Sequence, residues 1–145
     1  IVVDRGANAG VRLGLAVLDA DGLVGQVTRI QPLVSEVTLI TQKDHAVPVM
    51  VQRNGVRGVV YGLGDGYLEL RHLLADADVR ADDLLVTSGL DGVFPAGIPV
   101  ARVVSVDTGA GFSHIVCEPV ALGERRRYLM VVERVPAKEA SAGGA

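Results

Sequence analysis

Short apolar runs separated by turn-forming residues recur every 8 to 15 residues along the chain. Between Tyr67 and His72, leucines alternate with polar or aromatic neighbours, which is the two-residue period of a strand with one buried and one wet face. The pattern predicts about ten strands and hardly any helix. The predicted strands are Ala16 to Leu18, Leu23 to Ile30, Glu36 to Thr41, Val47 to Gln52, Gly58 to Tyr61, Tyr67 to His72, Leu84 to Thr87, Val100 to Val106, His114 to Glu118 and Leu129 to Val135.

The segments between these runs are rich in Gly, Asp and Asn, as in residues 19–22, 53–55, 62–66 and 107–111. Gly and Asn tolerate positive φ, and Asp bonds its own backbone, so these segments are typical of tight turns. Many short strands joined by such turns predict an all-β sandwich or barrel.

The chain also resembles itself, because residues 10–17 and 22–30 follow the same pattern as residues 78–86 and 97–106. This repeat predicts two similar small β-barrels in tandem. We expect the first barrel in residues 1–75 and the second in residues 76–136, with strands that the two can share. Residues 137–145 have little apolar surface to bury, and we expect them to form a disordered tail.

Composition supports strands and excludes some partners. Valine accounts for 26 of the 145 residues, whereas five residues are aromatic and none is Trp, so the core must be aliphatic. The net charge is −3, so the chain lacks the excess of positive charge with which proteins bind the phosphates of nucleic acids. No apolar run approaches the ~18 residues that cross a bilayer. Because the sequence opens on Ile1 without Met, we expect it to be a piece of a longer protein.

Candidate chemistry is sparse. Ser88 precedes Gly89 in a Thr-Ser-Gly turn, and neither the G-x-S-x-G pattern nor the G-D-S-G-G pattern of serine hydrolases occurs. The three histidines lie 27 or more residues apart, without metal-ligand spacing, and Cys117 has no partner for a disulfide and reads as a small core residue. We therefore predict no catalytic residue, no metal site and no cofactor.

Two features suggest contact surfaces instead. The basic run at residues 125–127 is a solvated loop or a contact for an acidic surface or anionic lipid. Aromatic side chains are enriched at interfaces. The interface candidates are therefore Tyr67, Phe94, Phe112, Tyr128, Arg125, Arg126 and Arg127. The alternative for each aromatic residue is a place in the core, where aromatic side chains are found more often than at contacts.

Three motifs resemble those of the MreC family of rod shape-determining proteins. They are D-R-G with the later G-V and G in residues 4–14, G-L-V-G-Q-V in residues 22–27, and V-T-S-G-L with F-P-A-G-I-P-V in residues 86–100. Asp82 and Ala101 depart from the family pattern, which usually has Gly at these positions. The positions that carry these turn motifs are Gly22, Gly25, Thr87, Ser88, Gly89, Phe94, Pro95, Gly97 and Pro99.

The resemblance implies two six-stranded β-barrels and a noncatalytic scaffold of the cell-elongation machinery, on the periplasmic face of the bacterial inner membrane. It implies a membrane helix and a coiled coil upstream of Ile1. The implied partners are further copies of the chain, MreB and MreD, and a penicillin-binding transpeptidase. The alternative is a secreted serine hydrolase or inhibitor on a protease-like double β-barrel. A carbohydrate-binding module is disfavoured by the few aromatic residues.

Overall fold

Alternating apolar and polar residues fold as short antiparallel strands. The computed structural model describes residues 2–3, 5–74, 76–90, 92–107, 114–121 and 130–132. Within these ranges the one helical element is the 3-10 helix η1 (Ala7–Ala9). The strands are β1 (Val2–Val3), β2 (Ala16–Leu18), β3 (Leu23–Ile30), β4 (Ser35–Leu39), β5 (Ala46–Val51), β6 (Arg57–Gly62), β7 (Leu68–Arg71), β8 (Leu84–Thr87), β9 (Pro99–Asp107), β10 (His114–Pro119) and β11 (Met130–Val132).

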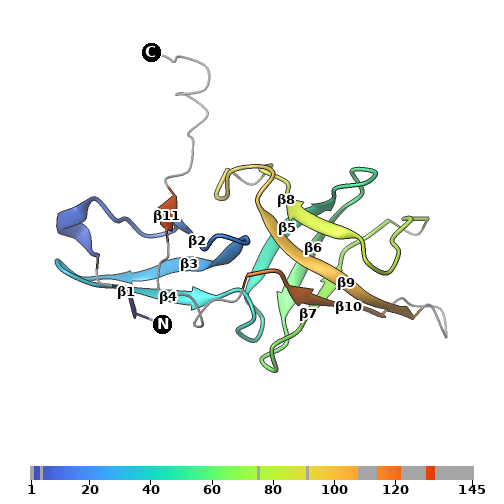
Figure 1. Cartoon of the computed structure of the whole chain (residues 1–145), viewed down its shortest axis with the longest axis horizontal. Helices are drawn as coiled ribbons and strands as arrows, with labels where there is room; N and C mark the ends of the chain where they lie inside the picture. The colour runs from blue at the N-terminus through green and yellow to red at the C-terminus, as the bar shows by residue number, and fades with distance from the viewer. Residues whose placement is uncertain are drawn as a thin grey trace, which may run out of the picture.

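One end of the molecule is a five-stranded antiparallel sheet in the order β1-β4-β3-β2-β11 (Figure 1). The long strand β3 pairs with β2 on one side and β4 on the other. Gly25 lies in β3 where β4 comes close, because a Cβ there would clash with the Thr38 carbonyl and lie 2.9 Å from Val37 Cγ1. Glycine at this position therefore permits the close approach of the two strands.

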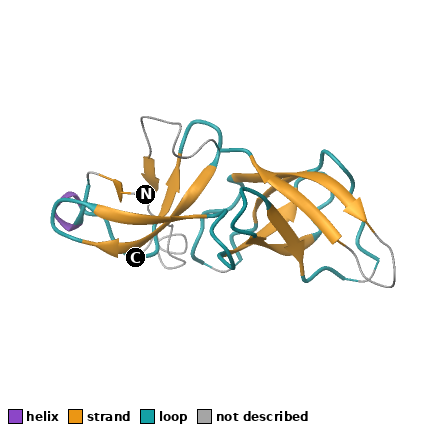
Figure 2. Cartoon of the chain, turned by 90° about the horizontal axis from the view of Figure 1, so that it is seen from below, coloured by secondary structure: helices purple, strands orange, loops and turns teal. Residues whose placement is uncertain are grey.

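The other end is a closed barrel of six strands in the order β10-β7-β6-β5-β8-β9, and Figure 2 shows it beside the sheet. Alternate residues point inward, so that in β5 Val47, Val49 and Val51 are buried while their neighbours are not. Since a buried Val contributes about 1.5–3 kcal/mol, this aliphatic interior supplies much of the stability of the barrel.

The sheet and the barrel have separate apolar cores that share two strands. In β2, Ala16 belongs to the barrel core and Val17 to the sheet core; in β3, Leu23 and Val24 divide in the same way. Successive strand residues point to opposite faces, which explains this division. Strands β2 and β3 therefore connect the packing of the two bodies.

The structure confirms the all-β class with little helix, and nine of the predicted strands are present with small differences at their ends. Of the tenth, Leu129 to Val135, residues 130–132 form β11 and the rest lie outside the described residues. The described strands form one six-stranded barrel. In the described residues the second body is a five-stranded sheet rather than a second barrel. Strand β1 and helix η1 were not predicted, because two or three residues are too few to show a period.

The expected division near residue 75 falls inside the barrel. Strand β5 pairs with β6 before that position and with β8 after it, for example between Met50 and Val86. The strand pairing instead separates residues 2–39, with β11, from residues 46–119. An internal repeat shows which segments look alike but not which ones pair. The tail predicted for residues 137–145 lies outside the described residues.

Candidate protein interface

The connection from β8 to β9 folds back onto the strand before it. The Thr87 amide donates a hydrogen bond to the Ile98 carbonyl, and the Gly97 amide donates one to the Thr87 carbonyl, both at 2.9 Å. The buried Thr87 hydroxyl accepts from the Ile98 amide at 2.9 Å and donates to the Pro95 carbonyl. Thr87 therefore holds the second half of the connection, residues 95–98, against the end of β8.

Glycines provide the sharp bends in this connection. Gly89 and Gly97 have φ of +74° and +86°, a region that side chains rarely adopt. A Cβ at Gly89 would also lie 2.7 Å from the Cβ of Ala96, where the two arms pass each other. Pro99 lacks an amide donor and begins β9 opposite Val86. These motif positions shape the backbone.

Ser88 lies at the first bend. Its hydroxyl accepts a hydrogen bond from the Leu90 amide at 3.4 Å, as in a turn. In the part of the chain that the structure describes, this hydroxyl makes no hydrogen bond to any of the three imidazoles. A serine nucleophile needs a base in such contact, so the geometry gives the hydrolase alternative no support.

Phe94 lies in the barrel core, with 4% of its surface exposed. The expectation that Phe94 contributes to an interface is therefore wrong. The physical reason is the fold-back of the β8–β9 connection, because the bonds made by Thr87 turn this arm toward the barrel. Sequence alone placed the phenylalanine in a turn and gave no direction for its ring.

Among the other aromatic candidates, Tyr67 is accessible, with 45% of its surface exposed just before β7. The remaining interface candidates lie outside the described residues; they are Phe112, Tyr128, Arg125, Arg126 and Arg127.

The turn between β2 and β3 contacts the start of β9 in the barrel. A Cβ on Gly22 would clash with the Pro99 carbonyl and lie 2.7 Å from Val120 Cγ2. Asp19 shapes this turn, since its Oδ1 accepts hydrogen bonds from the amides of Asp21 at 2.7 Å and Gly22 at 3.1 Å. Gly22 thus lets the turn sit directly against the barrel backbone.

The connection from the sheet to the barrel, residues 40–45, is bonded along the end of β6. The Asp44 amide donates to the Gly62 carbonyl at 2.9 Å, and the Gly62 amide donates to the His45 carbonyl at 3.0 Å. A Cβ on Gly62 would clash with the Gln42 carbonyl. We call this contact, together with the Gly22 turn, the junction. Backbone contacts at both places fix the sheet against the barrel.

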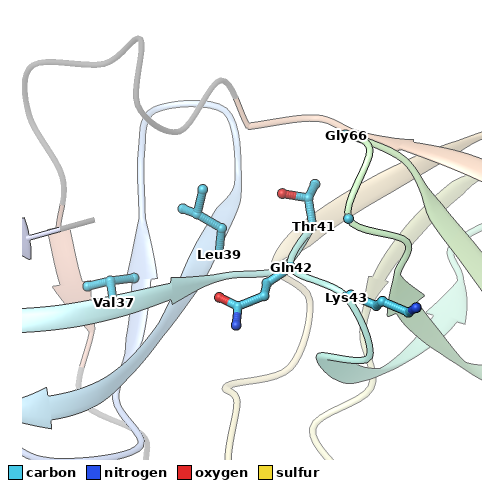
Figure 3. A pocket seen from close by; sticks show the side chains of 7 residues that line it. Val37, Leu39, Thr41, Gln42, Lys43 and Gly66 are labelled. Atoms are coloured by element: carbon cyan, nitrogen blue, oxygen red, sulfur yellow. The ribbon is translucent and has the colours of Figure 1, made fainter.

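A cavity of about 270 Å³ lies beside the junction (Figure 3). In Figure 3 the side chains of Leu39 and Thr41 point to the same side, while Lys43 points away from them. Apolar side chains from β4 with a few polar groups form a surface suited to contact with a protein side chain. The described lining residues are Val37, Leu39, Thr41, Gln42, Lys43, Gly64 and Gly66.

His45 lies at the end of the same connection and is half-buried. Burial lowers the pKa of its imidazole from the ordinary value of 6.5, because the charged form loses solvation. Its Nδ1 atom is buried and has no hydrogen-bond partner among the described residues. A proton on this ring would therefore place a poorly solvated charge at the junction.

Sequence reasoning missed an ion-pair cluster that ties the β5–β6 turn to residues 78–83. Arg53 donates to both carboxylate oxygens of Asp83, at 2.9 and 3.0 Å, and to Asp78 at 3.2 Å. These hydrogen bonds hold the pKa values of Asp83 and Asp78 below their usual range. The partners lie 25 and 30 residues apart in the chain, so no local spacing could indicate the cluster.

The residues that the structure describes offer little other site chemistry. They contain no group of three metal-binding side chains. No helix among them has the length and apolar character needed to cross a membrane. Cys117 is buried in the barrel core, and burial raises the pKa of its thiol to about 12, with a smaller effect from Glu69.

Comparison with known proteins identifies close relatives of this fold and sequence. The family model described as rod shape-determining protein MreC, barrel core, matches residues 1–133. Over 135 residues the chain is 44% identical to the cell shape-determining protein MreC of Escherichia coli, covering 91% of this chain and 37% of that protein. The corresponding protein of Haemophilus influenzae is 39% identical, with 91% and 38% covered. The chain thus spans well under half the length of these relatives.

Solved structures agree. The crystal structure of MreC from Pseudomonas aeruginosa superimposes with a TM-score of 0.85 at 45% identity, covering 92% of this chain and 88% of that one. A chain in the complex between penicillin-binding protein PBP2 and MreC from Helicobacter pylori superimposes with a TM-score of 0.65 at 24% identity, covering 79% and 73%. The second likeness shows a shared fold.

Proposed function

The chain belongs to the MreC family of rod shape-determining proteins, and we propose that it acts as a noncatalytic scaffold of the bacterial cell-elongation machinery. In this role it positions wall-synthesis proteins and contributes to cell shape through contacts alone. The junction is the observation that best supports the proposal. Backbone contacts at Gly22 and Gly62 hold the sheet and the barrel as a rigid surface on which partners can register.

The proposed partners are a penicillin-binding transpeptidase, further copies of the chain, and the MreB and MreD proteins. The Helicobacter pylori complex, in which an MreC binds PBP2, supports the first of these. The proposed location is the periplasmic face of the inner membrane. The cavity beside the junction is the proposed contact for the transpeptidase.

A domain replacement in Escherichia coli tests the scaffold role. The homologous segment of the native MreC is replaced by this chain, and cell shape is scored after depletion of the native copy. Rod-shaped cells are expected, because 44% identity over 91% of the chain preserves the fold. Loss of rod shape at a normal level of the chimera would contradict the proposal.

Purified proteins test the partners separately. We expect this chain to capture the soluble part of an elongation transpeptidase, and Leu39→Asp to weaken capture by placing a charge in the cavity. Leu74→Asp is the matched control, because Leu74 is 81% exposed and does not line the cavity. Equal loss in both variants would exclude the cavity as the contact. Sedimentation over a concentration series tests self-association, and a monomer throughout would contradict that part.

A fluorophosphonate probe distinguishes the scaffold from a serine hydrolase. No labelling of the chain is expected, because the Ser88 hydroxyl has no bonded imidazole in the described structure. Labelling that disappears in Ser88→Ala would favour the enzyme.

A further inference from the structure

The outer wall of the barrel over β6, β7 and β10 carries a connected set of polar side chains. In β7, Glu69 and Arg71 alternate with the buried Leu68 and Leu70, so both polar residues face outward. Tyr61 of β6 lies directly opposite Glu69. Three neighbouring strands therefore present these groups on one surface, which we call the Arg71 wall.

Arg71 is the central group of this wall. Its guanidinium carbon lies 4.7 Å from the centroid of the Tyr61 ring, and its Nε donates to Glu69 Oε1. Stacking and this single hydrogen bond fix the orientation of the guanidinium. Its terminal N–H groups make no hydrogen bond to any described residue, and 41% of the side chain is exposed. The wall thus holds an oriented arginine whose outer edge is open to a ligand.

Glu69 is covered by the nitrogen donors around it. Its side chain is 13% exposed, between Arg71 on one side and His114 Nδ1, at 2.7 Å, on the other. The Arg71 and His114 side chains are 41% and 56% exposed. The carboxylate therefore serves to position nitrogen donors, and the donors rather than the carboxylate face the solvent.

His72 completes the wall at the end of β7. Its Nε2 lies 2.8 Å from the Tyr61 hydroxyl, and the two rings meet edge to face at 5.5 Å. His72 adopts a φ of +64°, which is unfavourable for a residue with a side chain. Such backbone conformations cluster at functional sites because the surrounding structure must stabilise them.

The neighbours of the wall indicate what it accommodates. Half-buried valines flank the polar groups, with Val59 opposite Arg71 and Val116 opposite Glu69. Asp107 lies opposite His114 in the pairing of β9 with β10 and adds an acidic group on the β9 side. On the β6 side the charge is cationic, because the exposed Arg57 shares the outward face of β6 with Val59 and Tyr61. A ligand with both carboxylate and small apolar groups matches this surface.

We propose that the Arg71 wall binds an acidic segment of a partner protein, with a carboxylate of that segment held by the outer edge of Arg71. A guanidinium binds a carboxylate through two parallel hydrogen bonds, and its fixed orientation lowers the entropic cost of binding. A protein segment fits better than a bilayer, since half-buried valines can pack against side chains but do not project into lipid. The wall is separate from the junction cavity, so this inference and the proposed function can fail independently.

Fluorescence anisotropy of a labelled peptide tests the inference with the whole chain. The probe is an extended peptide of alternating Glu and Val, and the matched peptide has Gln in place of Glu. The Glu peptide is expected to bind at least about tenfold more tightly, because charge-assisted hydrogen bonds are roughly twice as strong as neutral ones. Equal binding of the two peptides would overturn the proposal.

Substitutions then test whether the Glu peptide binds at Arg71. Arg71→Gln is expected to weaken binding about tenfold, and Arg71→Lys about threefold or more, since lysine retains the charge but not the paired donors. Arg29→Gln is the matched control: it removes an arginine that is 71% exposed on the sheet, and less than about a twofold change is expected. An equal effect of Arg29→Gln and Arg71→Gln would show a nonspecific charge effect and overturn the assignment.

Two further measurements keep the test decisive. If Arg71→Gln lowers the unfolding midpoint, the comparison relies on Arg71→Lys, because lysine keeps the charge but loses the paired donors. Vesicles of phosphatidylglycerol are tested by sedimentation. Arg71-dependent binding to the vesicles without binding to the Glu peptide would assign the wall to a lipid headgroup and overturn the protein-segment proposal.

Discussion

At the scale of single residues, Asp82 shows how the sequence can indicate strain before a structure is known. The family resemblance places Gly at this position, and the structure gives Asp82 a φ of +71°. Its amide donates to the Val103 carbonyl at 2.8 Å, and its own carbonyl accepts from Arg102 at 2.9 Å. Both bonds involve the Asp82 backbone, the second with the Arg102 guanidinium as donor, so they hold the strained conformation whatever the side chain at position 82 is. The departure from the motif was therefore informative about geometry.

Asp82→Gly is expected to stabilise the chain by about 0.5–1 kcal/mol. The steric cost that a side chain pays at positive φ is larger than the extra conformational entropy that glycine gains in the unfolded state. Urea unfolding measures the change. Asp82→Ala is the control and is expected to destabilise, since alanine has the same steric cost without the polar side chain that favours this region. A lower midpoint for Asp82→Gly than for the parent would contradict the account.

His45 predicts a pH dependence of stability. Its folded-state pKa is below 6.5, so the unfolded chain binds the proton more readily, and stability falls as the pH drops below about 6.5. Unfolding free energies are compared between pH 7.5 and 5.5, a range above the titration of Asp78 and Asp83. His45→Gln is expected to flatten the profile in this range. An unchanged slope would show that His45 does not titrate on unfolding.

At the scale of elements, the strands were predictable and the directions of loop side chains were not. The alternation of Leu68 and Leu70 with Glu69 and Arg71 gave both the strand and its buried face, because strand periodicity is local. The β8–β9 connection was identified as a turn from its composition. The burial of Phe94 depends on hydrogen bonds made by Thr87 across the connection, and such contacts leave no periodic pattern in the sequence.

Thr87→Val tests that element. The substitution keeps the shape of the side chain but removes both hydroxyl hydrogen bonds, leaving the Ile98 amide without this partner. We expect a loss of about 1–3 kcal/mol, the cost of an unsatisfied buried polar group. Ser88→Ala is the neighbouring control, and its single hydroxyl contact at 3.4 Å predicts a change within about 0.5 kcal/mol. Similar losses in both variants would mean that Thr87 has no special role in the connection.

At the scale of the whole molecule, the pairing of distant strands decides which segments form a body. Strand β5 lies between β6 and β8 and so joins sequence on both sides of residue 75. The internal repeat predicted two similar barrels, but strand partners are set by long-range contacts that a repeat does not reveal. The contacts of the junction could not be predicted from the sequence either, although Gly22 was identified as a motif residue. Its close contact with Pro99 spans 77 positions, from residue 22 to residue 99.

The rigidity of the junction gives the final prediction, which compares two glycine substitutions on the barrel. Gly62→Ala forces a Cβ against the connection between sheet and barrel, and overpacking of this kind costs about 1–3 kcal/mol. Gly55→Ala has open space around its Cβ but a φ of +76°, so it costs about 1 kcal/mol through the backbone alone.

The two variants therefore lose comparable stability by different routes. Hydrogen exchange separates them. The Asp44 amide bonds the connection to the end of β6, and the Gly64 amide bonds the turn after β6 to Thr41 of the connection. Both amides should lose protection in Gly62→Ala and keep it in Gly55→Ala. Equal protection in both variants would mean that the connection is not held by this contact. The scaffold role would then need a different source of rigidity, because a loosely joined sheet and barrel present no fixed surface to a partner.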